Sequence, residues 1–319
     1  MYPNELFFGI DLYLVFLCIA VVAAIIVYRV MADKRKIEAK LYNFCLFTAV
    51  GAMVAGYFSA VLFQGLYNIA TYGRFYIMGA TFYGGLIGGA GFFLAVYFFV
   101  GNVIFKEDKL HIKRFFDIAD IAACSITIAH SLGRIGCLMA GCCHGRVTTA
   151  WYGINMWVDL NHDGVLEYAK LVPTQLFEAI FLAILFFYVV LRVKDNQTYC
   201  LQIYMCVYGV WRFIIEYMRN DYRGTTIIES VTPSQFIAIL MVLGGAALIY
   251  LQYRLVGSPK EEKASVTVAV ENEQDNSSLD TAETEEPVSD AVEEDDDYEY
   301  ASTYAKKDGE ASSDTKEDK

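Results

Sequence analysis

The sequence predicts an all-α polytopic membrane protein with about seven transmembrane helices. The first observation is composition, because 56% hydrophobic and 15% aromatic residues over 319 positions exceed what an ordinary soluble domain contains. The second is that the apolar residues gather in runs near the roughly 20 residues that a helix needs to cross a bilayer. The third is that Lys and Arg concentrate in alternate loops between these runs.

The expected spans follow one another through the first 256 residues. The first, at about 12 to 30, is not followed by the small-residue pattern of a signal cleavage site, so it is expected to remain in the protein. The others cover about 43 to 63, 79 to 105, 116 to 139, 173 to 191, 199 to 218 and 233 to 252. Small residues in the second, third and seventh runs allow helices to approach one another closely.

The basic residues of the loops predict the orientation, since cytoplasmic loops carry an excess of Lys and Arg. One set of alternate loops holds Arg29, Lys34, Arg35, Lys36, Lys40, Lys106, Lys109, Lys113, Arg114, Arg192, Lys194, Arg254 and Lys260. The other set holds Arg74, Arg146, Lys170, Arg219 and Arg223. The N-terminus is therefore expected outside and the C-terminus in the cytoplasm, and the fourth span is expected to end at the outer face.

The charge divides the chain into two domains. The net charge is -12, but residues 257 to 319 hold 21 acidic and 6 basic residues, so the first 256 carry a balance of +3. Such an acidic segment with few large apolar residues is typical of disorder. We expect a seven-span transmembrane domain at 1–256 and an acidic disordered cytoplasmic tail at 257–319.

The stretch from 130 to 146 holds two arginines, two histidines and three cysteines near the outer end of the fourth span. An arginine at membrane depth is costly and marks a functional candidate by default, which singles out Arg134. The eight cysteines of the chain lie mostly inside apolar runs, so no disulfide framework is expected.

The sixth span carries Tyr208, Arg212 and Glu216 at a spacing of four, which places them on one helix face. Two interpretations are open for this stripe. Arg212 and Glu216 can form an intrahelical ion pair with a purely structural role, or the stripe can belong to a functional site together with Arg134.

Two buried arginines with one obvious internal carboxylate leave positive charge that favours an anionic ligand. The sequence has no nucleotide-binding loop, and no helix carries the paired His and carboxylate spacing of a catalytic metal site. We therefore expect no cofactor, no metal and no nucleic acid partner. The anion expected is the phosphate of a phospholipid headgroup reached from within the bilayer.

Four motifs in order carry a family resemblance. They are Phe82-Tyr83-Gly84-Gly85-Leu86-Ile87-Gly88, Gly133-Arg134-Ile135-Gly136, Pro173-Thr174-Gln175-Leu176-Phe177-Glu178 and the stripe from Tyr208 to Glu216. Over about 6 to 253, the chain resembles the prolipoprotein diacylglyceryl transferases. This resemblance implies a bacterial cytoplasmic-membrane enzyme that transfers the diacylglyceryl group of phosphatidylglycerol to the lipobox cysteine thiol of a prolipoprotein signal peptide, with membrane lipid as its surroundings.

The resemblance also implies roles for individual residues. Arg134 and Arg212 would stabilise the leaving phosphate, Glu216 would orient Arg212, and Tyr208 would donate to a phosphate or glycerol oxygen. The expected substrate-binding residues are Arg134, Gly136, Tyr83, Gly84, Gly85, Gly145 and Arg146.

Three positions depart from the family pattern. Tyr83 stands where the family usually has a histidine, and Cys137 and Cys142 replace the usual asparagine and acidic residue. One interpretation is that His130, one turn before Arg134, or His144 supplies the missing base, so His130 is a catalytic candidate. A second is a metal site made by Cys137, Cys142, Cys143 and His144, although their spacing does not match common zinc motifs.

The third interpretation is a paralogue that binds lipid or assists membrane protein assembly without the transfer reaction. The matching charged and polar residues favour the transferase as the leading hypothesis.

Overall fold

The computed structural model describes residues 11–74, 79, 81–158, 165–219 and 231–256. The expected acidic tail lies outside the described residues. The helices are α1 (Leu12–Lys34), α2 (Ala39–Tyr72), α3 (Phe82–Ala95) with its π-helical continuation η1 (Val96–Val100), α4 (Gly101–Ile104), α5 (Leu110–Lys113), α6 (Phe115–Ala140), α7 (Thr174–Lys194), α8 (Cys200–Ile215), the 3-10 turn η2 (Glu216–Met218) and α9 (Pro233–Val256).

Six of the described helices are long and apolar enough to cross a membrane, and they coincide with six of the expected spans. The segment expected at 199 to 218 forms α8, which has 16 residues, followed by the three residues of η2. This span is therefore shorter than the others as a regular α-helix. The prediction of a polytopic helical membrane protein is confirmed.

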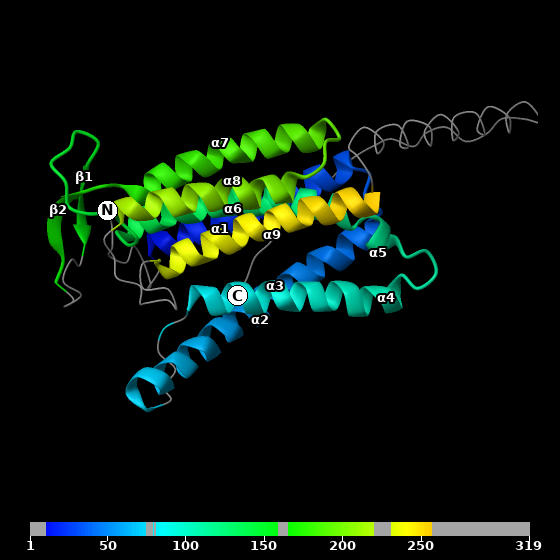
Figure 1. Ribbon diagram of the computed structural model, residues 1–319, viewed down its shortest axis with the longest axis horizontal. Helices are drawn as coiled ribbons and strands as arrows, with labels where there is room; N and C mark the ends of the chain where they lie inside the picture. The colour runs from blue at the N-terminus through cyan, green and yellow to red at the C-terminus, as the bar shows by residue number, and fades with distance from the viewer. Residues whose placement is uncertain (1–10, 75–78, 80, 159–164, 220–230, 257–319) are drawn as a thin grey trace, which may run out of the picture. The chain divides into compact units, whose positions relative to one another are not determined.

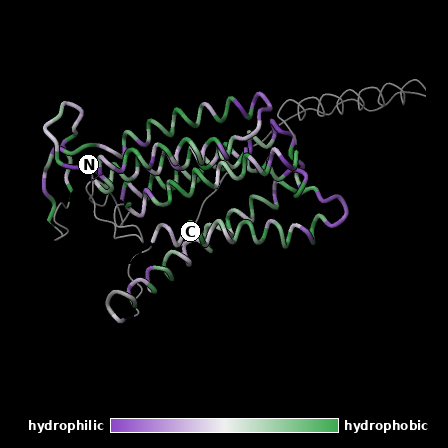
Figure 2. Tube along the Cα trace, viewed as in Figure 1, coloured by the Kyte–Doolittle hydropathy of each residue, from purple (hydrophilic) through white to green (hydrophobic). Residues whose placement is uncertain are grey.

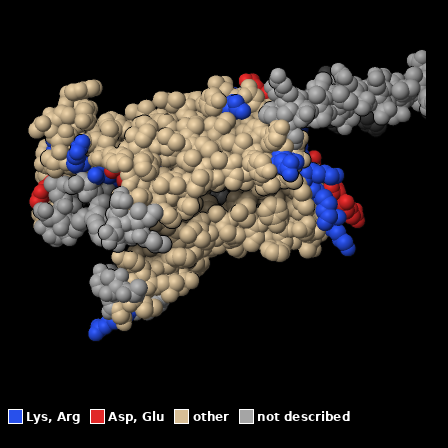
Figure 3. Space-filling model, viewed as in Figure 1, with Lys and Arg blue, Asp and Glu red and all other residues tan. Residues whose placement is uncertain are grey.

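The helices pack in two groups that are easy to follow in Figure 1. The helix α6 contacts α1, α7 and α8, and α9 lies along α8, whereas α2 packs against α3. Figure 2 shows hydrophobic residues along the lengths of the helices and hydrophilic residues near their ends. On the face drawn in Figure 3, Lys, Arg, Asp and Glu likewise lie at the ends, which leaves an uncharged lateral surface suited to lipid.

Small residues explain the contact between α2 and α3. A Cβ at Gly88 would collide with the side chain of Ser59, and a Cβ at Gly84 would lie 2.8 Å from Cγ of Phe63. The Ser59 hydroxyl donates to the Gly84 carbonyl at 2.8 Å. The glycines thus allow the two backbones to approach as the sequence predicted.

A β-hairpin between α6 and α7 was not predicted from the sequence. It pairs β1 (Ile154–Val158) with β2 (Glu167–Leu171) in antiparallel register, with Ile154 opposite Leu171. Met156, Val158 and Leu171 form a small buried cluster with Leu138 of α6. The hairpin therefore rests on the end of α6, where it fixes the loop that follows this helix.

Candidate active site

Two buried polar clusters meet on α8, one around Tyr208 and the other one turn later around Arg212. The first is centred on Glu178 of α7, whose side chain is fully buried. Arg134 Nη2 of α6 lies 3.0 Å from Glu178 Oε1, and the Tyr208 hydroxyl donates to the same oxygen at 2.6 Å. Three helices thus converge on one carboxylate.

The start of α7 places Glu178 accurately. Thr174 and Gln175, both fully buried, form the first turn of this helix. The Thr174 hydroxyl donates to the Cys143 carbonyl at 2.9 Å, and Gln175 Nε2 donates to the Cys142 carbonyl at 2.5 Å. These bonds join α7 to the loop after α6, so Arg134 and Glu178 are held by one connected unit.

His130 is the third member of the Glu178 cluster. Its Nδ1 lies 3.0 Å from the Tyr204 hydroxyl, and its Nε2 lies 3.3 Å from the Tyr208 hydroxyl. The Tyr208 hydroxyl donates its proton to Glu178, so it must accept from His130 Nε2–H. The other ring nitrogen, Nδ1, then carries no proton and accepts from the Tyr204 hydroxyl. Both ring nitrogens are therefore occupied by neighbouring tyrosines, and the ring positions Tyr208.

The second cluster contains the Arg212–Glu216 ion pair that was one of the two open interpretations of the stripe on α8. Arg212 Nη2 lies 2.9 Å from Glu216 Oε2 and donates to the Ser234 hydroxyl of α9 at 2.8 Å. The Thr232 hydroxyl donates to Glu216 Oε1 at 3.0 Å. Arg212 and Glu216 are both buried, so the pairing is part of the interior rather than of a solvated helix face.

The number of buried carboxylates beside the buried arginines differs from the number expected from the sequence. The expectation of one internal carboxylate is wrong, because Glu178 pairs with Arg134. Arg219 adds a third buried guanidinium, 3.9 Å from Glu216. Arg134 and Arg212 thus each have a carboxylate partner, Glu178 and Glu216.

Two buried donors in these clusters point to a ligand. Among the residues that the structure describes, Arg134 Nε and Arg212 Nη1 are buried and have no hydrogen-bond partner, which is also true of Nε in Arg35, Arg114 and Arg192 outside these clusters. Guanidinium N–H groups left unpaired in a buried site are costly, and an anion with several acceptor oxygens would satisfy them.

Tyr83 joins the second cluster from α3. Its hydroxyl lies 3.2 Å from the Ser234 hydroxyl, which in turn accepts from Arg212. The neighbouring Gly84 and Gly85 have a packing role, because a Cβ at Gly85 would lie 3.3 Å from Ala60 Cβ of α2. Their proposed contact with substrate stays a prediction.

The other expected substrate-binding residues occupy different surroundings. Gly136 packs against α1, where a Cβ would lie 3.2 Å from Phe16 Cβ. Gly145 donates to the Val172 carbonyl at 2.9 Å, and a Cβ there would lie 2.5 Å from the Met218 carbonyl oxygen. The Arg146 side chain is exposed. Its backbone N–H donates to the Met218 carbonyl, and its carbonyl accepts from the Val172 N–H. The structure does not bring the Arg146 guanidinium into either buried cluster.

An apolar groove of about 220 Å³ lies between α8 and α9. Its lining residues are all uncharged and mostly aliphatic: Gly209, Val210, Phe213, Ile214, Ala238, Ile239, Val242 and Leu243. A groove of this composition suits a hydrocarbon chain rather than a polar ligand.

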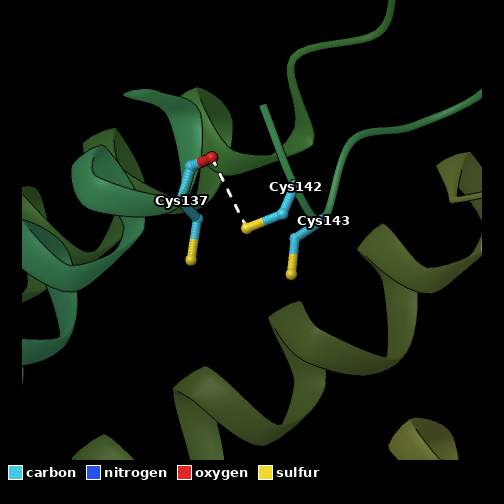
Figure 4. Close-up of side chains that lie close together, drawn as sticks. All are labelled: Cys137, Cys142 and Cys143. Carbon is cyan, nitrogen blue, oxygen red and sulfur yellow. Dashed lines mark hydrogen bonds between the residues drawn. The ribbon is translucent and has the colours of Figure 1, made fainter. Parts of the chain in front are cut away.

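Two of the departures from the family pattern, Cys137 and Cys142, lie together with Cys143 (Figure 4). The three sulfur atoms are within 4.8 Å of one another. None of the eight cysteines is in a disulfide bond in this structure. Hydrogen bonds with Cys137 and Cys143 raise the pKa of the Cys142 thiol above its ordinary value.

Sequence reasoning named Glu178 only as part of a family motif and missed its role as a partner of Arg134, and it missed the partners Tyr204, Arg219, Thr232 and Ser234. One signal was available for Glu178, because it is a single carboxylate inside an otherwise apolar span. Hydroxyl residues give no such signal, since they also occur in helix packing and helix caps.

Comparison with known proteins gives consistent matches. The family model described as prolipoprotein diacylglyceryl transferase matches residues 4–251. The chain is 30% identical over 218 residues to phosphatidylglycerol–prolipoprotein diacylglyceryl transferase 2 of Clostridium perfringens, which covers 66% of this chain and 78% of that protein. The phosphatidylglycerol–prolipoprotein diacylglyceryl transferase of Clostridium tetani is 30% identical over 169 residues, which are 52% of this chain and 61% of that protein. The transferase of Rickettsia rickettsii is 30% identical over 226 residues, and the alignment covers 66% of this chain and 79% of that protein.

Proposed function

Because the chain belongs to the prolipoprotein diacylglyceryl transferase family, we propose that it transfers the diacylglyceryl group of phosphatidylglycerol to the lipobox cysteine thiol of prolipoproteins. It is a multi-pass protein of the bacterial cell membrane. The relatives named as transferases favour this reaction over the alternative of a paralogue that only binds lipid.

The observation that carries the proposal is the pair of unsatisfied donors, Arg134 Nε and Arg212 Nη1. In the proposed reaction, the acceptor sulfur attacks the glyceryl carbon, and the bond from this carbon to the phosphate oxygen breaks. The leaving glycerol phosphate gains negative charge as this bond breaks. Guanidinium groups that are already fixed in an apolar site stabilise such charge without reorganising.

Glu178 and Glu216 serve as positioning residues in this proposal. Each holds one arginine by an ion pair, at 3.0 Å for Arg134 and 2.9 Å for Arg212. Each ion pair uses the Nη2 atom and leaves other nitrogens of the same guanidinium for the phosphate. The Tyr208 hydroxyl, which donates to Glu178, fixes the first of these carboxylates.

The groove between α8 and α9 supports a site for an acyl chain of the lipid donor. Val210 and Phe213 line it and flank Arg212 on the same helix. The groove therefore offers an apolar surface on the helix that carries Arg212. On the orientation expected from the basic loops, this site opens toward the outer half of the bilayer.

Complementation tests the proposed function in the cell. A strain depleted of its own transferase is expected to regain lipoprotein modification when this chain is expressed, as measured by mass spectrometry of a lipoprotein's N-terminal peptide. When Arg134 or Arg212 is replaced by alanine in the same assay, Arg29→Ala is the matched control. Arg29 forms an exposed ion pair with Asp33 away from both clusters. Unmodified lipoprotein despite good membrane expression of the wild type would contradict the proposal.

A further inference from the structure

The three thiols of Cys137, Cys142 and Cys143 are brought together by the way in which α6 ends. Gly141 has a left-handed backbone, with φ of 73°. The Cys142 N–H donates to the Cys137 carbonyl at 3.2 Å, and the Gly141 N–H donates to the Leu138 carbonyl at 3.3 Å. This is the Schellman pattern, in which the residues at the positions of Cys137 and Cys142 make a side-chain contact.

Cys143 joins them through an uncommon backbone conformation. Its φ is +61°, a region that residues other than glycine rarely adopt. In an extended chain, neighbouring side chains point to opposite sides, but here the sulfur atoms of Cys142 and Cys143 lie within 4.8 Å of each other and of the Cys137 sulfur (Figure 4). The bonds from Thr174 and Gln175 to the carbonyls of the two loop cysteines hold this conformation in place.

The geometry suits a thiophilic cation. Three sulfurs around a tetrahedral Zn²⁺ lie about 3.8 Å apart, because each Zn–S bond is about 2.3 Å long. The observed separations, all within 4.8 Å, need a contraction of about 1 Å at most for such a site. The expectation of no metal relied on spacing along the chain, which does not reveal the Schellman turn or the left-handed Cys143.

We propose that Cys137, Cys142 and Cys143 bind one zinc-like divalent cation, and that its fourth coordination position takes the thiol of the acceptor cysteine. Three protein ligands and one open position are typical of catalytic zinc sites. Cys142 is exposed, so the open position is accessible from the surface. This inference rests on the proposed transferase function.

The location of the cluster explains how it would act in that reaction. Cys137 lies three residues after Arg134 on α6, so the two side chains share one helix face. The cation would therefore hold the nucleophile beside the guanidinium that we propose for the phosphate. It would also supply the thiol activation for which the family resemblance expects a histidine at the position of Tyr83.

The step balances without any further reactant. The acceptor thiol binds the cation and releases its proton to water, because a coordinated thiol is deprotonated. The thiolate sulfur then forms a bond to the glyceryl carbon as the bond from that carbon to the phosphate oxygen breaks. The electron pair of this bond leaves with glycerol phosphate, and the thioether product leaves the cation.

Cobalt binding tests the site directly. The full chain is purified without oxygen in detergent, stripped with a chelator and titrated with Co²⁺, whose thiolate complexes have a characteristic charge-transfer absorption. We expect one Co²⁺ per chain, and loss of this absorption in Cys137→Ser, Cys142→Ser and Cys143→Ser. The Cys18→Ser variant is the matched control, because Cys18 is an exposed cysteine of α1, and it should keep the absorption.

Adding a lipobox peptide should then change the cobalt spectrum, whereas the same peptide with serine in place of cysteine should not. Transfer should fall by about tenfold or more in the stripped chain and return with Zn²⁺. A stripped chain that transfers normally, the absence of cobalt absorption in the wild type, or a spectrum unchanged by the peptide would each overturn the inference. Bound cobalt that responds to the peptide, in a chain without transfer under any condition, would instead contradict the proposed function.

Discussion

Arg134 on α6 and Glu178 on α7 form a buried ion pair, with Nη2 and Oε1 3.0 Å apart. Glu178 also accepts the Tyr208 hydroxyl, so this carboxylate ties α6, α7 and α8 together. The pair satisfies part of the Arg134 guanidinium and leaves Nε as a buried donor without a partner among the described residues. The Arg134–Glu178 pair thus holds three helices together and also leaves one guanidinium N–H of Arg134 for an anion.

The Glu178→Gln substitution should damage both roles. The amide keeps the size of the side chain but cannot neutralise Arg134, and breaking a buried ion pair by removing one partner costs about 3–5 kcal/mol. We expect a lower unfolding temperature in detergent and loss of diacylglyceryl transfer.

The control for Glu178 is Glu38→Gln. Glu38 forms a partly exposed pair with Arg114 at 3.7 Å, and pairs of this kind contribute less than about 1 kcal/mol. Equal stability of the Glu178→Gln and Glu38→Gln variants would show that the buried pair does not hold the helices together.

The His130→Gln substitution distinguishes a positioning role from general-base catalysis. Both ring nitrogens contact tyrosine hydroxyls, at 3.0 Å for Tyr204 and 3.3 Å for Tyr208. A positioning role predicts a lower kcat with an unchanged shape of the pH–rate profile. If the variant instead loses the acidic limb of that profile, His130 acts as the base and the positioning role is wrong.

The Val242→Phe substitution should obstruct the groove between α8 and α9. Val242 lines this space of about 220 Å³, and a larger ring would occupy the room of a hydrocarbon chain. We expect KM for phosphatidylglycerol with long acyl chains to rise, with little change for a short-chain donor. The Leu240→Phe variant is the control, because Leu240 is an exposed residue of α9 outside the groove lining. The same KM shift in both variants would argue against an acyl site in the groove.

The sequence was sufficient to predict much of the fold because membrane spans are defined by composition and length. Six expected spans coincide with long apolar helices, and the segment from 199 to 218 differs only because its last residues form the 3-10 turn Glu216–Met218. The hairpin was missed because its strands have five residues each, and their alternation is weak beside the strongly apolar helices.

The site was predictable where charge in an apolar span marked it, as for Arg134, Arg212 and Glu216. Its assembly was not, because the contact of Tyr83 with Ser234 joins residues 151 positions apart and depends on helix packing. The same limit applies to the cysteines, since the left-handed backbone of Cys143 is a property of the loop rather than of the residue type.

The central claim, that two buried guanidinium groups bind the phosphate of the lipid donor, is tested most directly by replacing each with lysine. Lysine keeps the charge but loses the planar set of donors that contacts a carboxylate and a phosphate at once. The measurement is transfer from phosphatidylglycerol to a lipobox peptide by the purified full chain, with Arg29→Lys as the exposed control. We predict that Arg134→Lys and Arg212→Lys each lower kcat/KM by about 100-fold or more while remaining folded in the membrane. Near-normal transfer by either variant would contradict the claim.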